Sequence, residues 1–168
     1  SSSCSVTRRA TSAAAAKARP PTTMTKRALV EVCITYAAAL SARGETQLAR
    51  EAYLTTVTAA LAEGDDNSRA FAELGLGNLL LPENPAQAQG HFRRAAEASG
   101  YGLWQASLNL AIALQRVGRE AEAAEVLEQQ WAREPTGAIG KAGLDLARSR
   151  QDAAAGARWE SRMGTDRP

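Results

Sequence analysis

Aromatic residues are scarce in this chain of 168 residues: they make up 5% of it, whereas hydrophobic residues make up 45% and 37 residues are alanine. A β-sheet core needs many aromatic and β-branched side chains, so an alanine-rich composition favours closely packed helices. A chain of this length suits one folded domain, in which about 70% of the unfolded surface is buried. The composition therefore predicts an all-α protein.

Cysteine and histidine are scarcer still. Cys4 and Cys33 are too few for a disulfide framework and lack the spacing of a metal site, and we expect Cys33 to be a buried, inert thiol. The one histidine, His91, has no cysteine or carboxylate placed to join it in a metal or catalytic set. No apolar run approaches the roughly 20 residues that span a bilayer. We predict no catalytic residues, no metal and no cofactor, and hence a protein that is not an enzyme.

The charges divide the chain into two segments. Residues 1–30 contain six basic residues and no acidic one, whereas the rest contains 14 basic and 18 acidic residues. Residues 1–25 are rich in Ser, Thr, Ala and Arg and have too few large apolar groups to offset their ordering entropy, so we expect a disordered leader before a folded domain over 26–168. This composition is typical of organelle transit peptides, and we hypothesise targeting to the chloroplast or, alternatively, the mitochondrion. A basic tail on a protein of the bacterial cytoplasm is the other interpretation.

The body of the chain contains one small pattern four times, an alanine followed four residues later by a bulky side chain. The copies are Ala49/Tyr53, Ala88/Phe92, Ala123/Leu127 and Ala155/Trp159. Each alanine follows another small residue by 12 or 13 positions, and these residues are Ala37, Gly75, Ala111 and Gly143. Two small residues on facing helices let the backbones approach closely, and the bulky residue fills the gap beside them. Recurrence after 39, 35 and 32 residues is typical of stacked helical hairpins.

Turn residues and hydrophobic periodicity predict eight helices in four hairpins. Their expected ranges are 26–42, 46–62, 68–80, 86–98, 103–116, 120–133, 138–148 and 151–162. Asn67 or Ser68 is placed to cap the third helix. Trp159 takes the bulky position of the last hairpin, so we expect it in the core.

These hairpins resemble the tetratricopeptide repeat, and the second hairpin resembles the Sel-type variant with a longer turn. The third hairpin matches the family pattern at Leu110, Ala111, Leu114, Gly118, Ala123, Leu127 and Pro135. The first matches it at Tyr36, Ala37, Leu40, Gly44, Ala49 and Tyr53. The second departs from the family pattern at Asn78, and the fourth is rich in glycine. The resemblance implies a right-handed α-α superhelix of about four hairpins.

In that family the first helices of the hairpins line a concave groove that holds a segment of a partner protein. The corresponding positions here are Ile34, Ala38, Leu76, Leu79, Leu80, Leu108, Ile112, Gln115, Arg116, Leu144 and Arg148. These residues are largely apolar, with basic residues toward the far end, and the lysines and asparagines that clamp a C-terminal carboxylate in chaperone-binding members are missing. An apolar amphipathic helix or extended segment is therefore the expected partner.

Two functions follow as hypotheses. The first is a scaffold that binds a protein segment, as a peripheral subunit or assembly factor of a larger, organellar complex, with Trp104 as a candidate surface anchor. The second is an RNA-binding helical-repeat protein of an organelle. The net acidic repeat body and its leucine-rich groove disfavour the second, because only the basic leader could contact phosphates.

Overall fold

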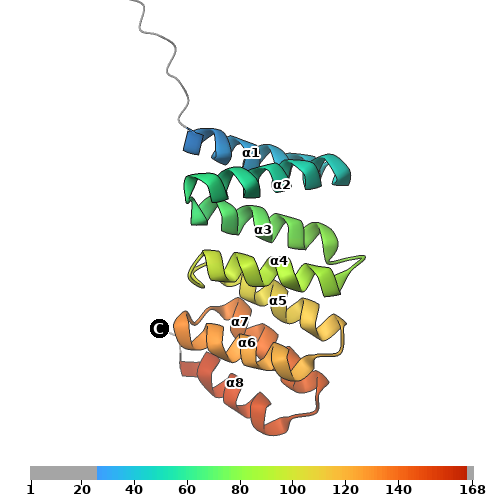
Figure 1. Cartoon of the computed structure of the whole chain (residues 1–168). Coiled ribbons are helices and arrows are strands. Elements are labelled where there is room, and N and C mark those ends of the chain that lie inside the picture. The colour runs from blue at the N-terminus through green and yellow to red at the C-terminus, as the bar shows by residue number, and fades with distance from the viewer. Residues whose placement is uncertain (1–25, 166–168) are drawn as a thin grey trace, which may run out of the picture.

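The computed structural model describes residues 26–165, and every regular element in this range is an α-helix. The helices are α1 (Lys26–Ala42), α2 (Thr46–Glu63), α3 (Asp66–Leu80), α4 (Pro85–Ala98), α5 (Trp104–Arg116), α6 (Glu120–Arg133), α7 (Gly137–Ser149) and α8 (Ala153–Thr165). Each helix packs against the next, and they follow one another along a single stack from α1 to α8 (Figure 1). The predicted all-α fold of eight sequential helices is confirmed. The predictions for residues 1–25 lie outside the described residues.

The starts of α3, α4, α7 and α8 are fixed by side chains that accept a hydrogen bond from a backbone amide. Asn84 accepts from the amide of Gln87 at the start of α4, with an N···O distance of 3.0 Å. At the start of α3, Asp65 Oδ1 accepts a hydrogen bond from the backbone amide of Ser68, with an N···O distance of 3.1 Å. The prediction that Asn67 or Ser68 caps α3 was wrong, because Asp65 already satisfies the amide at this end and the helix begins two residues earlier than expected.

The odd-numbered helices contact one another as well as the even-numbered helices next to them in the chain. Besides the sequential contacts, α1 contacts α3 and α5 contacts α7. Hydrogen bonds join α3 to α5: Asn109 Nδ2 donates to Asn78 Oδ1 at 2.7 Å, and an Arg116 guanidinium nitrogen donates to the Leu81 carbonyl at 2.9 Å. The odd helices therefore form one side of the stack.

The core is built from small residues and the bulky residues that fill the space beside them. Ala88, Phe92, Ala123 and Leu127 are fully buried, and a main cluster containing them runs from α4 to α8. A smaller cluster joins α1, α2 and α3. In the last hairpin a Cβ added at Gly143 would lie 2.2 Å from the ring of Trp159, which is 3% exposed. The predicted core position of Trp159 is confirmed.

The second hairpin has a different register from the predicted one. A Cβ at Gly75 would lie 2.3 Å from the Tyr53 ring of α2, whereas a Cβ at Gly77 would lie 2.4 Å from the Phe92 ring of α4. The small residue that faces the bulky residue of its own hairpin is therefore Gly77, and Gly75 faces the preceding hairpin instead. Both glycines satisfy the sequence pattern about equally, since Gly77 precedes Ala88 by 11 residues and Gly75 by 13.

Candidate protein-binding surface

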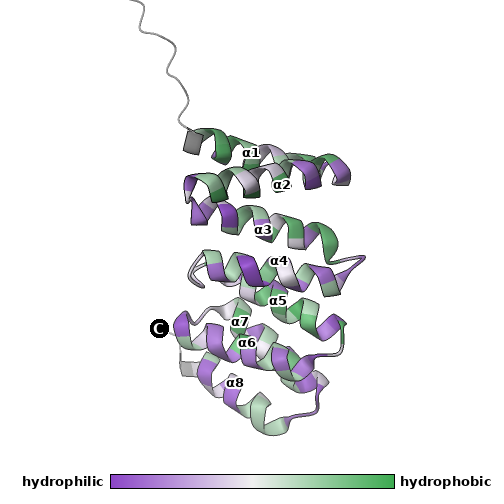
Figure 2. Cartoon of the chain, viewed as in Figure 1, coloured by the Kyte–Doolittle hydropathy of each residue, from purple (hydrophilic) through white to green (hydrophobic). Residues whose placement is uncertain are grey.

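Large apolar side chains reach the surface at one end of the described chain. Those exposed are Leu29, Val32, Tyr36, Leu48, Leu54, Leu61 and Phe71, and all of them belong to α1, α2 or α3. Figure 2 colours much of α1 and α2 as hydrophobic, whereas α6 and α8 are more hydrophilic. Exposed apolar clusters commonly mark sites of interaction with other proteins.

The odd helices carry one candidate surface, which we name the odd-helix face. Its residues are Ile34 and Ala38 on α1, Phe71 and Asn78 on α3, and Asn109, Ile112 and Arg116 on α5. Helical periodicity places Phe71 and Asn78, two turns apart, on one side of α3. The hydrogen bond between Asn78 and Asn109 then joins this side to the corresponding side of α5.

The structure places the predicted groove residues in three environments. The half-buried residues are Ile34, Leu79, Leu80, Leu108, Ile112 and Gln115; the exposed ones are Ala38, Arg116 and Arg148; the buried ones are Leu76 and Leu144. Leu76 is 2% exposed and packs in the cluster that contains Ala37 and Tyr53. Leu144 is 8% exposed and belongs to the main core. These last two are interior residues, in contrast to their predicted position on a binding surface.

Phe71 is the residue that sequence reasoning missed. It is 42% exposed and lies on the side of α3 that carries Asn78. The two-residue error in register at Gly75 selected Leu76, Leu79 and Leu80 for this surface in place of Asn78, Leu81 and Pro82, which lie at the same steps from Gly77. Phe71 precedes Gly77 by six residues, a step that the prediction used in none of the hairpins.

Trp104, the predicted surface anchor, is the first residue of α5. Its side chain is half-buried and packs partly against the main core cluster. Cys33 is likewise half-exposed, in contrast to the prediction of a buried thiol.

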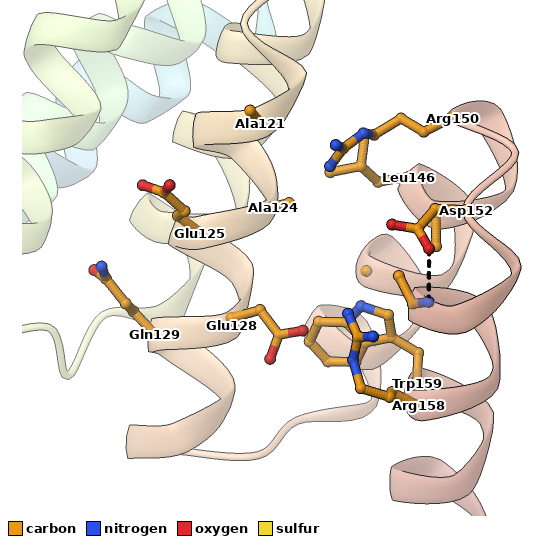
Figure 3. Close-up of a pocket in the computed structure, with 13 residues that line it drawn as sticks. Ala121, Ala124, Glu125, Glu128, Gln129, Leu146, Arg150, Asp152, Arg158 and Trp159 are labelled. Carbon is orange, nitrogen blue, oxygen red and sulfur yellow. Dashed lines mark hydrogen bonds between the residues drawn. The ribbon is translucent and has the colours of Figure 1, made fainter.

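A cleft of about 420 Å³ lies between α6 and the last two helices (Figure 3). Acidic side chains of α6, including Glu125, line one wall, and Arg150 and Arg158 lie across from them. Glu128 pairs with Arg162, and Asp152 accepts the amide of Ala155 at 2.9 Å as the cap of α8. Several of the polar groups here thus serve helix capping and ion pairing. Within residues 26–165, no group of three His, Cys, Asp or Glu side chains is arranged to hold a metal ion.

His91 belongs to a polar cluster around the buried carboxylate of Glu73 that the sequence did not predict. Its Nδ1 lies 2.7 Å from Glu73 Oε2, and Arg94 Nε donates to Glu73 Oε1 at 2.8 Å. The Glu73 side chain is 5% exposed. Burial raises the pKa of Glu73, but the hydrogen bonds and charges of His91 and Arg94 outweigh it and hold the pKa below its ordinary value of 4.5. The sequence analysis did not anticipate this contact, in which Glu73 on α3 meets His91 on α4 across the helix pair.

This cluster predicts a dependence of stability on pH. A lowered native pKa means that Glu73 adds to stability above its unfolded pKa of 4.5, and that this contribution disappears as pH falls through the native pKa. In urea titrations, we expect the free energy of unfolding of the wild type to fall between about pH 6 and pH 3. The fall should be smaller for Glu73→Gln, which has no carboxylate to protonate at this position. The matched variant Glu134→Gln, at an exposed position, should show the same dependence of unfolding free energy on pH as the wild type. If the unfolding free energy of Glu73→Gln depended on pH as steeply as that of the wild type, the stabilising role of the ionised Glu73 carboxylate would be contradicted.

Comparison of the chain with protein-family models, curated proteins and solved structures finds no match. The resemblance to the tetratricopeptide repeat therefore depends on the residues quoted above. Across residues 26–165, none of the helices combines the length and apolar character needed to cross a bilayer.

Proposed function

We propose that this protein is a non-catalytic helical-repeat adaptor that binds an apolar helix or extended segment of a partner protein on its odd-helix face. It would act as a peripheral subunit or assembly factor of a larger complex. The observation that carries this proposal is the exposed phenyl ring of Phe71 on α3, the helix that contacts α1 and is hydrogen-bonded to α5. Full burial of such a side chain is worth about 1.5–3 kcal/mol, and a partner segment would supply it.

The polar groups on this face are compatible with an apolar partner. Asn78 and Asn109 bond to each other, and Arg116 bonds to the Leu81 carbonyl. Covering a polar group costs little when its hydrogen bonds are already made within the protein. Arg148, on α7, pairs with Glu160 at 3.3 Å. The partner therefore does not have to match the two asparagines with polar side chains of its own, whereas the charged guanidinium of Arg116 would stay in contact with water at the edge of the contact.

A charge introduced at Phe71 tests the proposal. Phe71→Glu is expected to weaken partner binding by about 2 kcal/mol, or about thirtyfold, as loss of an aromatic anchor commonly does. The assay is affinity capture from native extract with quantitative mass spectrometry, followed by titration of the identified partner. Leu54→Glu is the matched control, because Leu54 is similarly exposed at 45% but lies on α2. Ile112→Glu should behave like Phe71→Glu.

Circular dichroism shows whether each variant keeps its helices. The proposal fails if a partner captured by the wild type is retained equally by Phe71→Glu and Ile112→Glu. It also fails if Leu54→Glu loses that partner to the same extent while remaining folded.

Two finer statements belong to the same proposal. The hairpins would wind into a right-handed superhelix, which the sequential packing and the shared side of the odd helices support. The complex would reside in an organelle, the chloroplast first, as the composition of residues 1–25 suggests. Sequencing the N-terminus of the protein from its source cell tests the second statement, since a mature protein that retains residues 1–25 would contradict it.

A further inference from the structure

Helix α1 is apolar on two sides, and only one of them is covered by the described residues. Val30 and Leu40 are buried, at 5% exposure or less. The other side, which we name the end face, carries Leu29, Val32 and Tyr36, whose exposed fractions are 53%, 51% and 59%. Helices that are apolar all round are normally buried all round.

The same positions are buried in the next two hairpins. Counting from the small residues Ala37, Gly77 and Ala111, the equivalents of Val32 and Tyr36 are Ala72 and Leu76 on α3, and Ala106 and Leu110 on α5. None of these four is more than 6% exposed.

Within the chain, these positions are covered by the preceding helix, which runs antiparallel to the odd helix. Leu76 clusters with Tyr53 of α2, and the two residues are equally far from the turn between α2 and α3. Ala106 clusters with Ala95 of α4 in the same way. No described helix precedes α1. The end face therefore has the character of a contact that still needs an antiparallel helix.

The two ends of the stack differ in polarity. At the far end, the exposed residues of α8 include Arg158, Glu160 and Ser161. Among the described residues, no large hydrophobic side chain after Phe71 is exposed (Figure 2). The outermost helix of a repeat stack needs a polar outer side, and α8 has one whereas α1 does not. Two copies would therefore bury apolar surface by joining their α1 ends, which closes as a symmetric dimer, and not by joining an α1 end to an α8 end, which leads to an open array.

The end face also contains an apolar hollow. A cleft of about 260 Å³ opens between α1 and α2. Leu29 and Cys33 of α1 line it on one side, and Ala59 and Ala62 of α2 line it on the other. The one charged side chain in its lining is that of Glu63, the last residue of α2. The cleft thus offers space for an apolar or aromatic side chain.

We propose that two copies of this chain pair through their end faces, with α1 of one copy antiparallel to α1 of the other about a two-fold axis beside residue 34. This axis gives each α1 the antiparallel neighbour that α2 gives to α3. Tyr36 of each copy then lies opposite Val32 of the other, and its ring enters the cleft of the other copy between Leu29 and Cys33. The face is self-complementary because one rotation brings each exposed ring to the other copy's hollow.

The stripe that forms this contact is free of charge. Leu29, Val32, Tyr36 and Ala39 follow one another at steps of three and four residues, which is the spacing of a helix–helix seam. Between residues 28 and 42, Glu31 is the only charged residue, and helical periodicity turns it away from the seam. Two copies of α1 can therefore approach without burying like charges against each other.

Opposite charges meet at the ends of the contact. The two-fold count places Arg43 of the second copy beside the start of α1, where Glu63 lines the end of the cleft. The Arg43 side chain is 75% exposed, beside Glu45, and can reach across the contact. By symmetry the same pair forms at the other end. Complementary charges of this kind select one register among those that an apolar stripe allows.

The size of the face agrees with a reversible dimer. Helices α1 and α2 have 17 and 18 residues. At about 1.5 Å per residue each is roughly 25 Å long, and two helices about 8–10 Å apart present a face about 20 Å wide. The two copies together would cover roughly 1,000 Å², the size at which specific interfaces begin.

Sedimentation equilibrium of the full chain over a concentration series tests the pairing. We expect the mass to rise from one chain to two and no further. Tyr36→Glu changes both copies, and since loss of one aromatic anchor commonly weakens binding about thirtyfold, the dimer dissociation constant should rise roughly a thousandfold. Val32→Lys should act in the same direction. Leu54→Glu is the matched control: Leu54 is 45% exposed but lies on a different side of α2 from the cleft, so the constant should not change.

Cross-linking at Cys33 tests the register. Cys4→Ser leaves Cys33 as the sole thiol, and the proposed axis places the two Cys33 side chains near each other. A short bismaleimide should join two copies of this chain, and adding Tyr36→Glu should abolish the product. The matched control carries Cys4→Ser, Cys33→Ser and Ala38→Cys, which moves the thiol to an exposed position on another side of α1; it should give no covalent dimer.

Three results would overturn the proposal. The first is a mass of one chain at every concentration, which would leave the end face to another occupant. The second is growth beyond two chains, and the third is a dimer that persists in folded Tyr36→Glu and Val32→Lys. Circular dichroism reports whether each variant keeps its helices. The outcome is independent of the proposed function, because Tyr36→Glu leaves Phe71 unchanged and should retain the partner that the odd-helix face binds.

Discussion

Replacing Phe92 with alanine is expected to lower the free energy of unfolding by about 4 kcal/mol. Phe92 is fully buried in the main cluster, and its ring lies against the backbone of α3 at Gly77. Truncation removes the transfer free energy of the ring and leaves a cavity between α3 and α4. Each hairpin in a helical stack depends on its neighbours, so weakening the contact between α3 and α4 should also make α1–α3 unfold in a separate step from α4–α8. Urea denaturation followed by circular dichroism, with hydrogen exchange resolved by helix, measures both effects.

A double-mutant cycle tests whether Gly77 on α3 and Phe92 on α4 are in direct contact. Gly77→Ala alone should be destabilising, because its Cβ would lie 2.4 Å from the buried Phe92 ring. In the Phe92→Ala background the same methyl group enters the space left by the ring, so the two changes should couple by about 1–2 kcal/mol. Additive effects would show that Gly77 and Phe92 do not meet as described.

The helices could be predicted almost completely because their signals are local. Gly44, Gly64 and Gly118 sit at positive φ in the turns that end α1, α2 and α5, a conformation that favours glycine. Hydrophobic periodicity between these turns then fixes each helix. The start of α3 was misplaced by two residues because several residues between 65 and 68 can cap a helix and sequence alone does not rank them. The last helix, α8, also begins two residues and ends three residues later than the predicted range of 151–162.

The binding surface could be predicted only in part, because it depends on register between helices. Ile34 and Ile112 were identified from the positions of Ala37 and Ala111. In the second hairpin, Gly75 and Gly77 are both packed against rings, one from each neighbour, and only the three-dimensional structure separates their roles. The choice decided whether Leu76 or Asn78, the residue that follows the small residue, would be assigned to the surface.

The polar cluster around Glu73 could not be predicted for a related reason. Glu73 and His91 are 18 residues apart and lie on different helices. Their contact depends on how far α3 slides along α4, which the length of the intervening turn does not determine. Nothing in the local sequence of either residue distinguishes a buried ion pair from two solvated side chains.

Replacing Gly143 with valine is expected to cost about 3 kcal/mol, the upper end of the usual penalty for overpacking. A Cβ at this position would lie 2.2 Å from the Trp159 ring, and that ring cannot move freely because it packs against the Trp131 ring in a T-shaped arrangement with centroids 5.5 Å apart. The close approach of α7 to α8 therefore depends on having no side chain at this position. The last hairpin should unfold at lower urea concentration, with the change detected by tryptophan fluorescence.

Gly156, in α8 of the same hairpin, provides the matched comparison. A Cβ at Gly156 would meet no atom within 4 Å, so Gly156→Ala should stabilise the protein by about 1 kcal/mol through helix propensity alone. Two glycines on facing helices of one hairpin are thus expected to respond with opposite signs. If Gly143→Val proved neutral, or if both substitutions stabilised, α7 and α8 would not approach as closely as this packing requires, and the small-residue pattern would lose its physical basis in the fourth hairpin.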